Sequence, residues 1–337
     1  MQVSKLDIFD FGIDLFKFLC SFLVCMIHIT PIQGVEFKYS GYINYILQHG
    51  ICRIAVPFFF CASGFLLFNK IDIKHIDTNR IKTYSFKNLR LLGLWITLLF
   101  LGSTVQLWYL GGVVIATVLS FFILRKSKSI KRLLVVGLCL YIIGLLFDSY
   151  SGFVIAFSNK LSVNIISDMV HFLNNDISRT FRLGFFCSLL FFALGIWFSK
   201  QQKSINTFVS WIGLLVSIVF VTIEALFVKH YSSPLDHNMY FSLVPATIFL
   251  FNIAKNVKLH DSSIYKQIRV LGVLIFFLHL FVSAILELLF PLLKTNFGLN
   301  LLFLNLLLTI IITTLIAMLI MKMTNKKRYN WLKCLYA

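Results

Sequence analysis

The sequence predicts an all-α integral membrane protein, a polytopic bundle of about ten transmembrane helices with both termini in the cytoplasm. Three observations lead to this fold class. The 337 residues are 59% hydrophobic, and their mean hydropathy is +0.88. Apolar runs of roughly 20 residues, the length that crosses a bilayer as a helix, recur from end to end. Lysine and arginine gather in alternate connecting segments, as in proteins that follow the positive-inside rule.

We expect the apolar runs to form one membrane domain over residues 1–337, with no soluble domain. The first run lacks the cleavage site of a signal peptide and is expected to stay as a span. The fourth run is short and begins at Gly111 and Gly112, so it could be broken or re-entrant. In chain order the runs fall near 13–31, 51–69, 89–108, 110–124, 133–148, 183–199, 207–228, 239–254, 270–290 and 299–321.

The basic residues predict the orientation. Of the 31 lysines and arginines, 23 fall on the side shared with the termini and six on the opposite side, while Lys17 and Arg53 lie within runs. The positive side is expected to be cytoplasmic, which leaves the long segment 149–182 outside. The formal charge of +18 is therefore a topology signal, and we predict no nucleic-acid partner.

The first two runs carry polar side chains that are costly in a bilayer, which suggests a cavity or a partner. Lys17 and His28 are 11 residues apart, so on a helix they share one stripe about 16 Å apart along the axis. Lys17 could instead pair with Asp14, and His28 could lie in the headgroup zone. Arg53 opens the second run near the expected depth of His28. It could hold an anion, or extend its side chain to the interface.

Further candidates have equally plausible packing or solvation roles. They are Ser63 beside Gly64, Trp108 at an outer boundary, Arg179 and Arg182 before the sixth run, Glu224 and Glu287 near outer ends, and His279 in the ninth run. The seven cysteines include no CxxC pair, and the sequence contains no GxSxG, Walker A or HExxH motif. We predict no metal site and no permanently bound cofactor.

Two strings in the first hairpin, DLFKFLCSFLVCMIH and RIAVPFFFCASGFLL, resemble the opening of membrane acyltransferase family 3, which includes bacterial O-acetyltransferases of surface polysaccharides. Lys17, His28 and Arg53 match the polar residues of that pattern. The string LWYL at 107–110 resembles a later motif, although Gln106 stands where histidine is usual. The resemblance implies catalytic roles for His28 and Arg53, acyl-CoA contact for Lys17, and substrate contact for Arg179, Ser63, Trp108 and His279.

A closer resemblance within that family is carried by three strings, DSYSG at 148–152, SRTFRLGFF and HNMYFSLVP. They are similar to the membrane half of vancomycin-resistance serine racemases, which continues into a soluble pyridoxal-phosphate domain and is credited with serine uptake. This sequence ends at Ala337, soon after its last apolar run, so racemisation is not expected.

Two functions follow from these resemblances. The favoured one is an O-acyltransferase of the bacterial cytoplasmic membrane. It would use acetyl-CoA or another acyl-CoA as co-substrate and a hydroxyl of a surface glycan as acceptor, with His28 as general base. The alternative is a transporter of serine or a similar small polar molecule, in which Arg53 and Arg179 bind a carboxylate.

Overall fold

The computed structural model describes residues 5–34, 38–98, 108–260 and 262–336, and every regular element in these ranges is helical. Eight helices in these ranges are long and apolar enough to cross a membrane. They span 11–28, 40–68, 108–127, 130–147, 183–200, 207–231, 263–297 and 302–324. The all-helical, multi-pass prediction is confirmed at this level.

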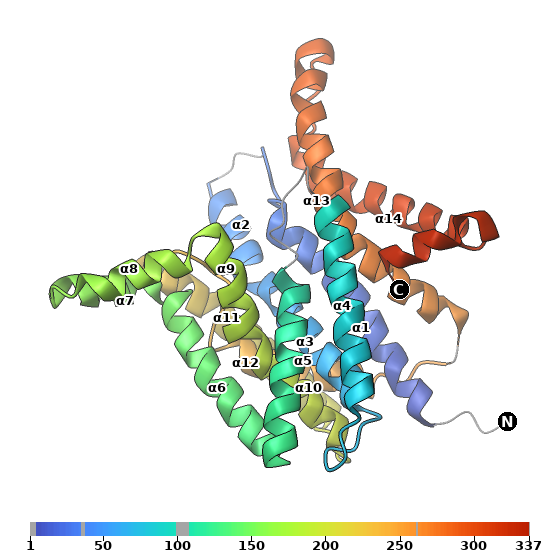
Figure 1. Cartoon of the computed structure of the whole chain (residues 1–337). Helices are drawn as coiled ribbons and strands as arrows, with labels where there is room; N and C mark the ends of the chain where they lie inside the picture. The colour runs from blue at the N-terminus through green and yellow to red at the C-terminus, as the bar shows by residue number, and fades with distance from the viewer. Residues whose placement is uncertain (1–4, 35–37, 99–107, 261, 337) are drawn as a thin grey trace. The chain divides into compact units, whose positions relative to one another are not determined.

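The described chain divides into two compact units, and Figure 1 traces the course of the chain through them. Unit 1 comprises residues 1–55, 93–106 and 257–337, and unit 2 comprises residues 56–92 and 107–256. Both units are assembled from segments that are far apart in the sequence, so neither could be recognised as a block of consecutive residues.

Unit 1 is built around the pairing of the first long helix with the longest one, near the end of the chain. Gly272 lies against the Phe18 backbone, so the two helices approach closely where no Cβ intervenes. The elements of unit 1 are α1 (Lys5–His28), α2 (Ser40–His49), η1 (Ile51–Ile54), α13 (Ser263–Phe297), η4 (Leu302–Leu304), α14 (Asn305–Thr324) and η5 (Lys327–Leu335).

Unit 2 packs its helices through glycines that face the backbone or rings of a neighbour, as small residues do in membrane helices. Its elements are α3 (Ala55–Phe68), α5 (Trp108–Ser127), α6 (Ile130–Phe147), α7 (Ser151–Lys160), α8 (Asn164–Leu173), α9 (Asp176–Arg182), the π-helical turn η3 (Leu183–Cys187), α10 (Ser188–Lys200), α11 (Thr207–Tyr231) and α12 (Leu243–Asn256). Helix α4 (Thr78–Leu98) begins in unit 2 and ends in unit 1.

Three details differ from the sequence-based expectation or lie beyond the described residues. Helix α5 runs without a break through Gly111 and Gly112, so the fourth span is neither broken nor re-entrant. Gly112 fits against the Phe60 ring and Gly184, which explains a glycine there by packing. The segment 149–182, between the fifth and sixth expected spans, folds into α7, α8 and α9, and Figure 1 shows α7 beside α8. The third expected span, 89–108, falls partly on residues 99–107, which lie outside the described residues.

Candidate functional site

Four charged side chains of unit 2 meet in one buried network, which we call the charged cluster (Asp148, Arg179, Arg182 and Asp236). Asp148 follows α6, the two arginines lie on α9, and Asp236 lies between α11 and α12. These positions fall in or beside the three strings DSYSG, SRTFRLGFF and HNMYFSLVP. Segments about 30 to 90 residues apart in the sequence thus form one site.

Arg182 is the centre of the charged cluster and is completely buried. Its guanidinium donates to Asp148 Oδ2 at 2.6 Å, to Asp236 Oδ2 at 2.7 Å and to the Leu173 carbonyl at 3.2 Å. A buried arginine is stable only when its donors are satisfied in this way. Although burial opposes the charged form, Asp148 and Asp236 hold the pKa of Arg182 above its ordinary value.

Asp148 also organises the backbone that precedes α12. Its Oδ1 atom accepts from the Asn238 amide at 2.7 Å, the Met239 amide at 3.0 Å and the Ser149 hydroxyl at 3.0 Å. Burial and the nearby Asp236 carboxylate raise the pKa of Asp148, and Arg182 acts in the opposite direction. This carboxylate therefore joins α6, α9 and the segment before α12.

The remaining residues of the DSYSG string fix the same segment. Ser151 Oγ accepts from the Leu235 amide at 3.0 Å, and Ser232 Oγ donates to the Ser149 carbonyl at 3.3 Å. A Cβ added at Gly152 would overlap the Ser232 carbonyl oxygen, so only glycine fits there without movement. Four of the five residues of the string, Asp148, Ser149, Ser151 and Gly152, thus hold or fit against the 232–239 segment.

Arg179 differs from Arg182 because its side chain is 35% exposed. It forms a two-point contact with Asp236, from Nε to Oδ2 at 2.7 Å and from Nη2 to Oδ1 at 3.0 Å. Asp236 would still contact Arg182 and the His237 amide if Arg179 turned away. Arg179 is therefore the member of the charged cluster that can exchange its partner for an incoming anion.

A π-helical turn follows the charged cluster directly. The turn, Leu183–Cys187, separates Arg182 from the regular helix α10. Single π turns within helices shift the direction of the side chains before them and are frequent at functional sites.

Unit 1 brings together two of the predicted site residues, His28 and His279. Their ring centroids are 5.5 Å apart, at the end of α1 and in the middle of α13. His279 is fully buried, with Nδ1 at 3.1 Å from the Ile275 carbonyl. Its Nε2 atom makes no hydrogen bond to any described residue.

Arg53 and Lys17, the other two predicted residues of unit 1, have distinct surroundings. Arg53 lies in the short helix η1, where Nε donates to the Gln48 carbonyl at 3.0 Å and Nη2 lies 3.1 Å from His49 Nδ1. Lys17 is half-buried on α1. The carboxylate considered for it, Asp14, binds Arg269 instead, at 2.8 Å from Nε and 2.5 Å from Nη2.

Ser63 and Trp108 belong to the packing of α3 against α5. Ser63 Oγ lies 2.9 Å from the Tyr109 hydroxyl, which also donates to the Phe59 carbonyl at 3.3 Å. The Trp108 ring packs against Phe60 with centroids 5.8 Å apart. The predicted site residues thus belong to both units, with Lys17, His28, Arg53 and His279 in unit 1 and Ser63, Trp108 and Arg179 in unit 2.

The sequence-based reading missed Asp148 and Asp236 as site residues, although it quoted the strings around them. Asp148 stands in DSYSG, and Asp236 directly precedes HNMY. Two arginines three residues apart on a short helix require acids nearby if they are buried, and Asp148 and Asp236 are the acids in or beside the other two strings.

Comparison with known proteins found relatives named for amino-acid racemisation. A protein from Enterococcus faecalis named amino-acid racemase is 26% identical over an alignment of 350 positions that covers 94% of this chain and 47% of the relative. A second amino-acid racemase from Enterococcus faecalis is 27% identical over 263 residues, 72% of this chain and 35% of the relative. A serine/alanine racemase from Enterococcus gallinarum is 25% identical over 300 residues, 81% of this chain and 41% of the relative.

The chain thus spans about half the length, or less, of the curated relatives it matches. No family model matches it, and no solved structure matches it. The similarity to racemases agrees with the closer of the two resemblances seen in the sequence. The wider resemblance to membrane acyltransferase family 3 stays a prediction, and so does the expectation that this chain does not racemise.

These names contradict the predicted acyltransferase activity, and that prediction is corrected here. Racemisation is an isomerase reaction, and none of the three relatives is named for acyl transfer. The catalytic roles of His28 and Arg53 and the acyl-CoA contact of Lys17 were derived from acyl transfer and are not carried forward. Acyl-CoA and a surface-glycan acceptor were predicted as parts of the same activity, and nothing in the structure tests them.

Proposed function

We propose that this chain is a multi-pass protein of the bacterial cytoplasmic membrane that takes up serine or a similar small amino acid. Two findings support the substrate class. The relatives are named for reactions of amino acids, one of them for serine and alanine. The three strings that resemble the membrane half of such racemases meet in the charged cluster.

The Arg179–Asp236 pair is the observation that carries this proposal. An amino acid at neutral pH bears a carboxylate and an ammonium group on one carbon. Arg179 offers a planar fork that fits a carboxylate at two points. When the substrate carboxylate takes that fork, the freed oxygens of Asp236 can accept from the substrate ammonium group. Arg182 keeps Asp236 partly neutralised throughout, so no carboxylate is left buried without a cation.

The proposed topology puts this pair on the outer side of the membrane. It has ten spans with both termini in the cytoplasm, so the segments before α10 and α12 connect spans at the external face. Arg179 precedes α10 and Asp236 precedes α12. A site that faces outward before transport is what uptake requires.

The predicted site residues outside the charged cluster have no catalytic role in this proposal. His28 and His279 give α1 and α13 a polar contact within a largely apolar unit. Arg53 remains a second candidate for carboxylate binding, with His49 and the Gln48 carbonyl as its present partners. Ser63 and Trp108 are assigned to packing.

Uptake of labelled serine into vesicles that contain the purified protein tests the proposal. Arg179→Gln keeps a polar side chain but removes the charged fork. Since hydrogen bonds to charged groups contribute about 1.5–3 kcal/mol, uptake at low serine should fall roughly tenfold to hundredfold. Arg132→Gln removes another exposed arginine, at the start of α6, and should leave uptake unchanged.

Alanine and glycine should compete with labelled serine, because both carry the carboxylate and ammonium groups that the pair recognises. Choline, which lacks the carboxylate, should not compete. Vesicles that accumulate none of the three amino acids would show the proposal to be wrong. So would an Arg179→Gln protein that transports serine as well as the wild type does.

A further inference from the structure

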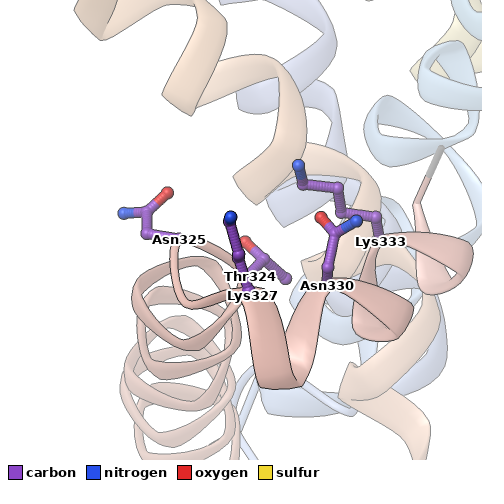
Figure 2. A pocket seen from close by; sticks show the side chains of 5 residues that line it. All are labelled: Thr324, Asn325, Lys327, Asn330 and Lys333. Atoms are coloured by element: carbon purple, nitrogen blue, oxygen red, sulfur yellow. The ribbon is translucent and has the colours of Figure 1, made fainter.

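A basic cavity in unit 1 has no part in the proposed uptake. It forms where η5 returns along the end of α14, has a volume of about 430 Å³, and is shown in Figure 2. An adjoining cavity of about 410 Å³ extends to the start of α13 and shares Thr324, Asn325 and Lys333 with the first. We call the two together the basic pocket.

The wall of the basic pocket is held in place by contacts within unit 1. The Tyr336 hydroxyl donates to Thr324 Oγ1 at 3.2 Å, which ties the end of η5 to the end of α14. Trp95 Nε1 donates to the Leu335 carbonyl at 3.1 Å, and the Trp95 ring stacks on Phe277 with centroids 4.7 Å apart. The segment after α14 is therefore a folded wall of the pocket.

The basic pocket carries positive charge from four lysines. Lys327 and Lys333 line the first cavity, as Figure 2 shows, and Lys266 and Lys322 line the second. All four lysines are exposed, and none forms an ion pair with a described residue. Residues 288–337 contain no aspartate or glutamate at all. The pocket therefore attracts an anion from solution or from the membrane surface.

One wall of the basic pocket is apolar. Leu271 of α13 and Met318 and Met321 of α14 line the second cavity beside the lysines. Met318 is 54% exposed on a helix that is apolar enough to span the membrane. Positive charge at the end of a span, next to exposed apolar side chains, complements a molecule with an anionic head and an acyl chain.

We propose that the basic pocket binds the phosphate headgroup of an anionic phospholipid. Lys327 and Lys333 contact the phosphate oxygens, Asn325 and Asn330 supply further donors, and the first part of an acyl chain lies along Met318 and Met321. In the proposed topology this end of α14 is cytoplasmic. Lysines near that surface gain from the negative charge of the inner leaflet.

The test compares lipids that bind to the purified full chain in detergent. Fluorescent phosphatidylglycerol and phosphatidylcholine are titrated against the wild type and against Lys327→Gln/Lys333→Gln. The wild type should prefer phosphatidylglycerol, and the double variant should bind it about thirtyfold more weakly. Its affinity for phosphatidylcholine and its thermal unfolding should not change, because both lysines are exposed.

A matched control removes the same charge elsewhere. Lys126 in the last turn of α5 and Lys131 in the first turn of α6 are exposed and lie on the same predicted side of the membrane. Lys126→Gln/Lys131→Gln should bind phosphatidylglycerol as the wild type does. If both double variants lost the same affinity for phosphatidylglycerol, net charge would be responsible and the proposal would be overturned. Unchanged affinity in both double variants would also overturn it.

Two further arms distinguish a lipid from a free anion. Met321→Gln keeps every lysine but makes the apolar wall polar, so it should weaken phosphatidylglycerol binding severalfold. Inorganic phosphate should displace the lipid only at far higher concentration than unlabelled phosphatidylglycerol does. Displacement by phosphate at a concentration similar to that of the lipid would assign the pocket to a small anion and overturn the lipid assignment.

Discussion

Arg179 and Arg182 lie three residues apart on α9, yet they differ in what surrounds them. Arg182 is fully buried between Asp148 and Asp236, whereas Arg179 is partly exposed and contacts Asp236 alone among the described carboxylates. A buried ion pair whose partner is removed leaves an uncompensated charge, while an exposed pair adds little to stability. Arg182 is therefore structural, and Arg179 is available for binding.

Arg182→Gln should destabilise the protein by roughly 3–5 kcal/mol, because it leaves Asp148 and Asp236 buried with too little positive charge. Thermal unfolding in detergent, followed by the near-ultraviolet signal of the tryptophans, measures the change. Arg179→Gln serves as the control and should unfold close to the wild-type temperature. Similar unfolding temperatures for wild type and Arg182→Gln would mean that the buried cluster does not stabilise unit 2.

The helices α3 and α10 contact each other through glycine in both directions. A Cβ added at Gly64 would overlap the Phe192 carbonyl oxygen, and a Cβ added at Gly195 would overlap that of Cys61. Backbone atoms cannot rotate away as side chains can, so both glycines are required by the closeness of the two helices. The packing role considered for Gly64 beside Ser63 is therefore the one seen here.

Gly195→Ala should lower stability by about 1–3 kcal/mol, because the helices must separate to admit the methyl group. Gly111→Ala is the matched control, since Gly111 is also a helical glycine of unit 2 but has open space within 4 Å of the added Cβ. It should leave stability unchanged or raise it by up to about 1 kcal/mol through helix propensity. The two variants can be compared by the yield of monodisperse protein and by thermal unfolding. Equal behaviour of the two would refute a close α3–α10 contact.

At the scale of the whole molecule, the distribution of basic residues predicts the topology. Of the lysines and arginines, 23 lie on the predicted cytoplasmic side and six on the opposite side, which is a large asymmetry. Two of the 23, both in unit 2, also stabilise helix ends. Lys200 donates to the Phe68 and Ile71 carbonyls at 2.8 and 2.7 Å, and Lys255 donates to the Phe198 carbonyl at 2.8 Å. Lysines at carboxyl ends of helices complement the negative end of the helix dipole.

Reporter fusions measure this topology. A green fluorescent protein fused after Ala337 should fluoresce, and alkaline phosphatase fused at the same point should be inactive, because the carboxyl terminus is predicted to be cytoplasmic. Phosphatase inserted in the turn between α7 and α8, residues 161–163, should be active on the outer side. The opposite pattern at either point would refute the predicted orientation and with it the outward-facing position of Arg179.

Sequence alone determined the helical membrane class and most of the spans, because the free energy of inserting a helix depends on about 20 consecutive residues. Even the unexpected helices α7 to α9 lie where a long external segment was predicted. The resemblance strings also located the segments of the charged cluster. What they did not reveal was that Asp148 and Asp236 hold Arg182, since that depends on which segments become neighbours.

Only the tertiary structure decided the partners of the charged residues. Asp14 has Lys17 three residues away, the local partner that helix geometry suggests, yet it binds Arg269, which is 255 residues distant. Lys17 and Asp14 are placed by the helix they share, whereas Arg269 is placed by the packing of α13 on α1. A span is a local property of the chain, but an ion pair belongs to the assembled bundle, where burial makes the closest well-oriented cation the favoured one.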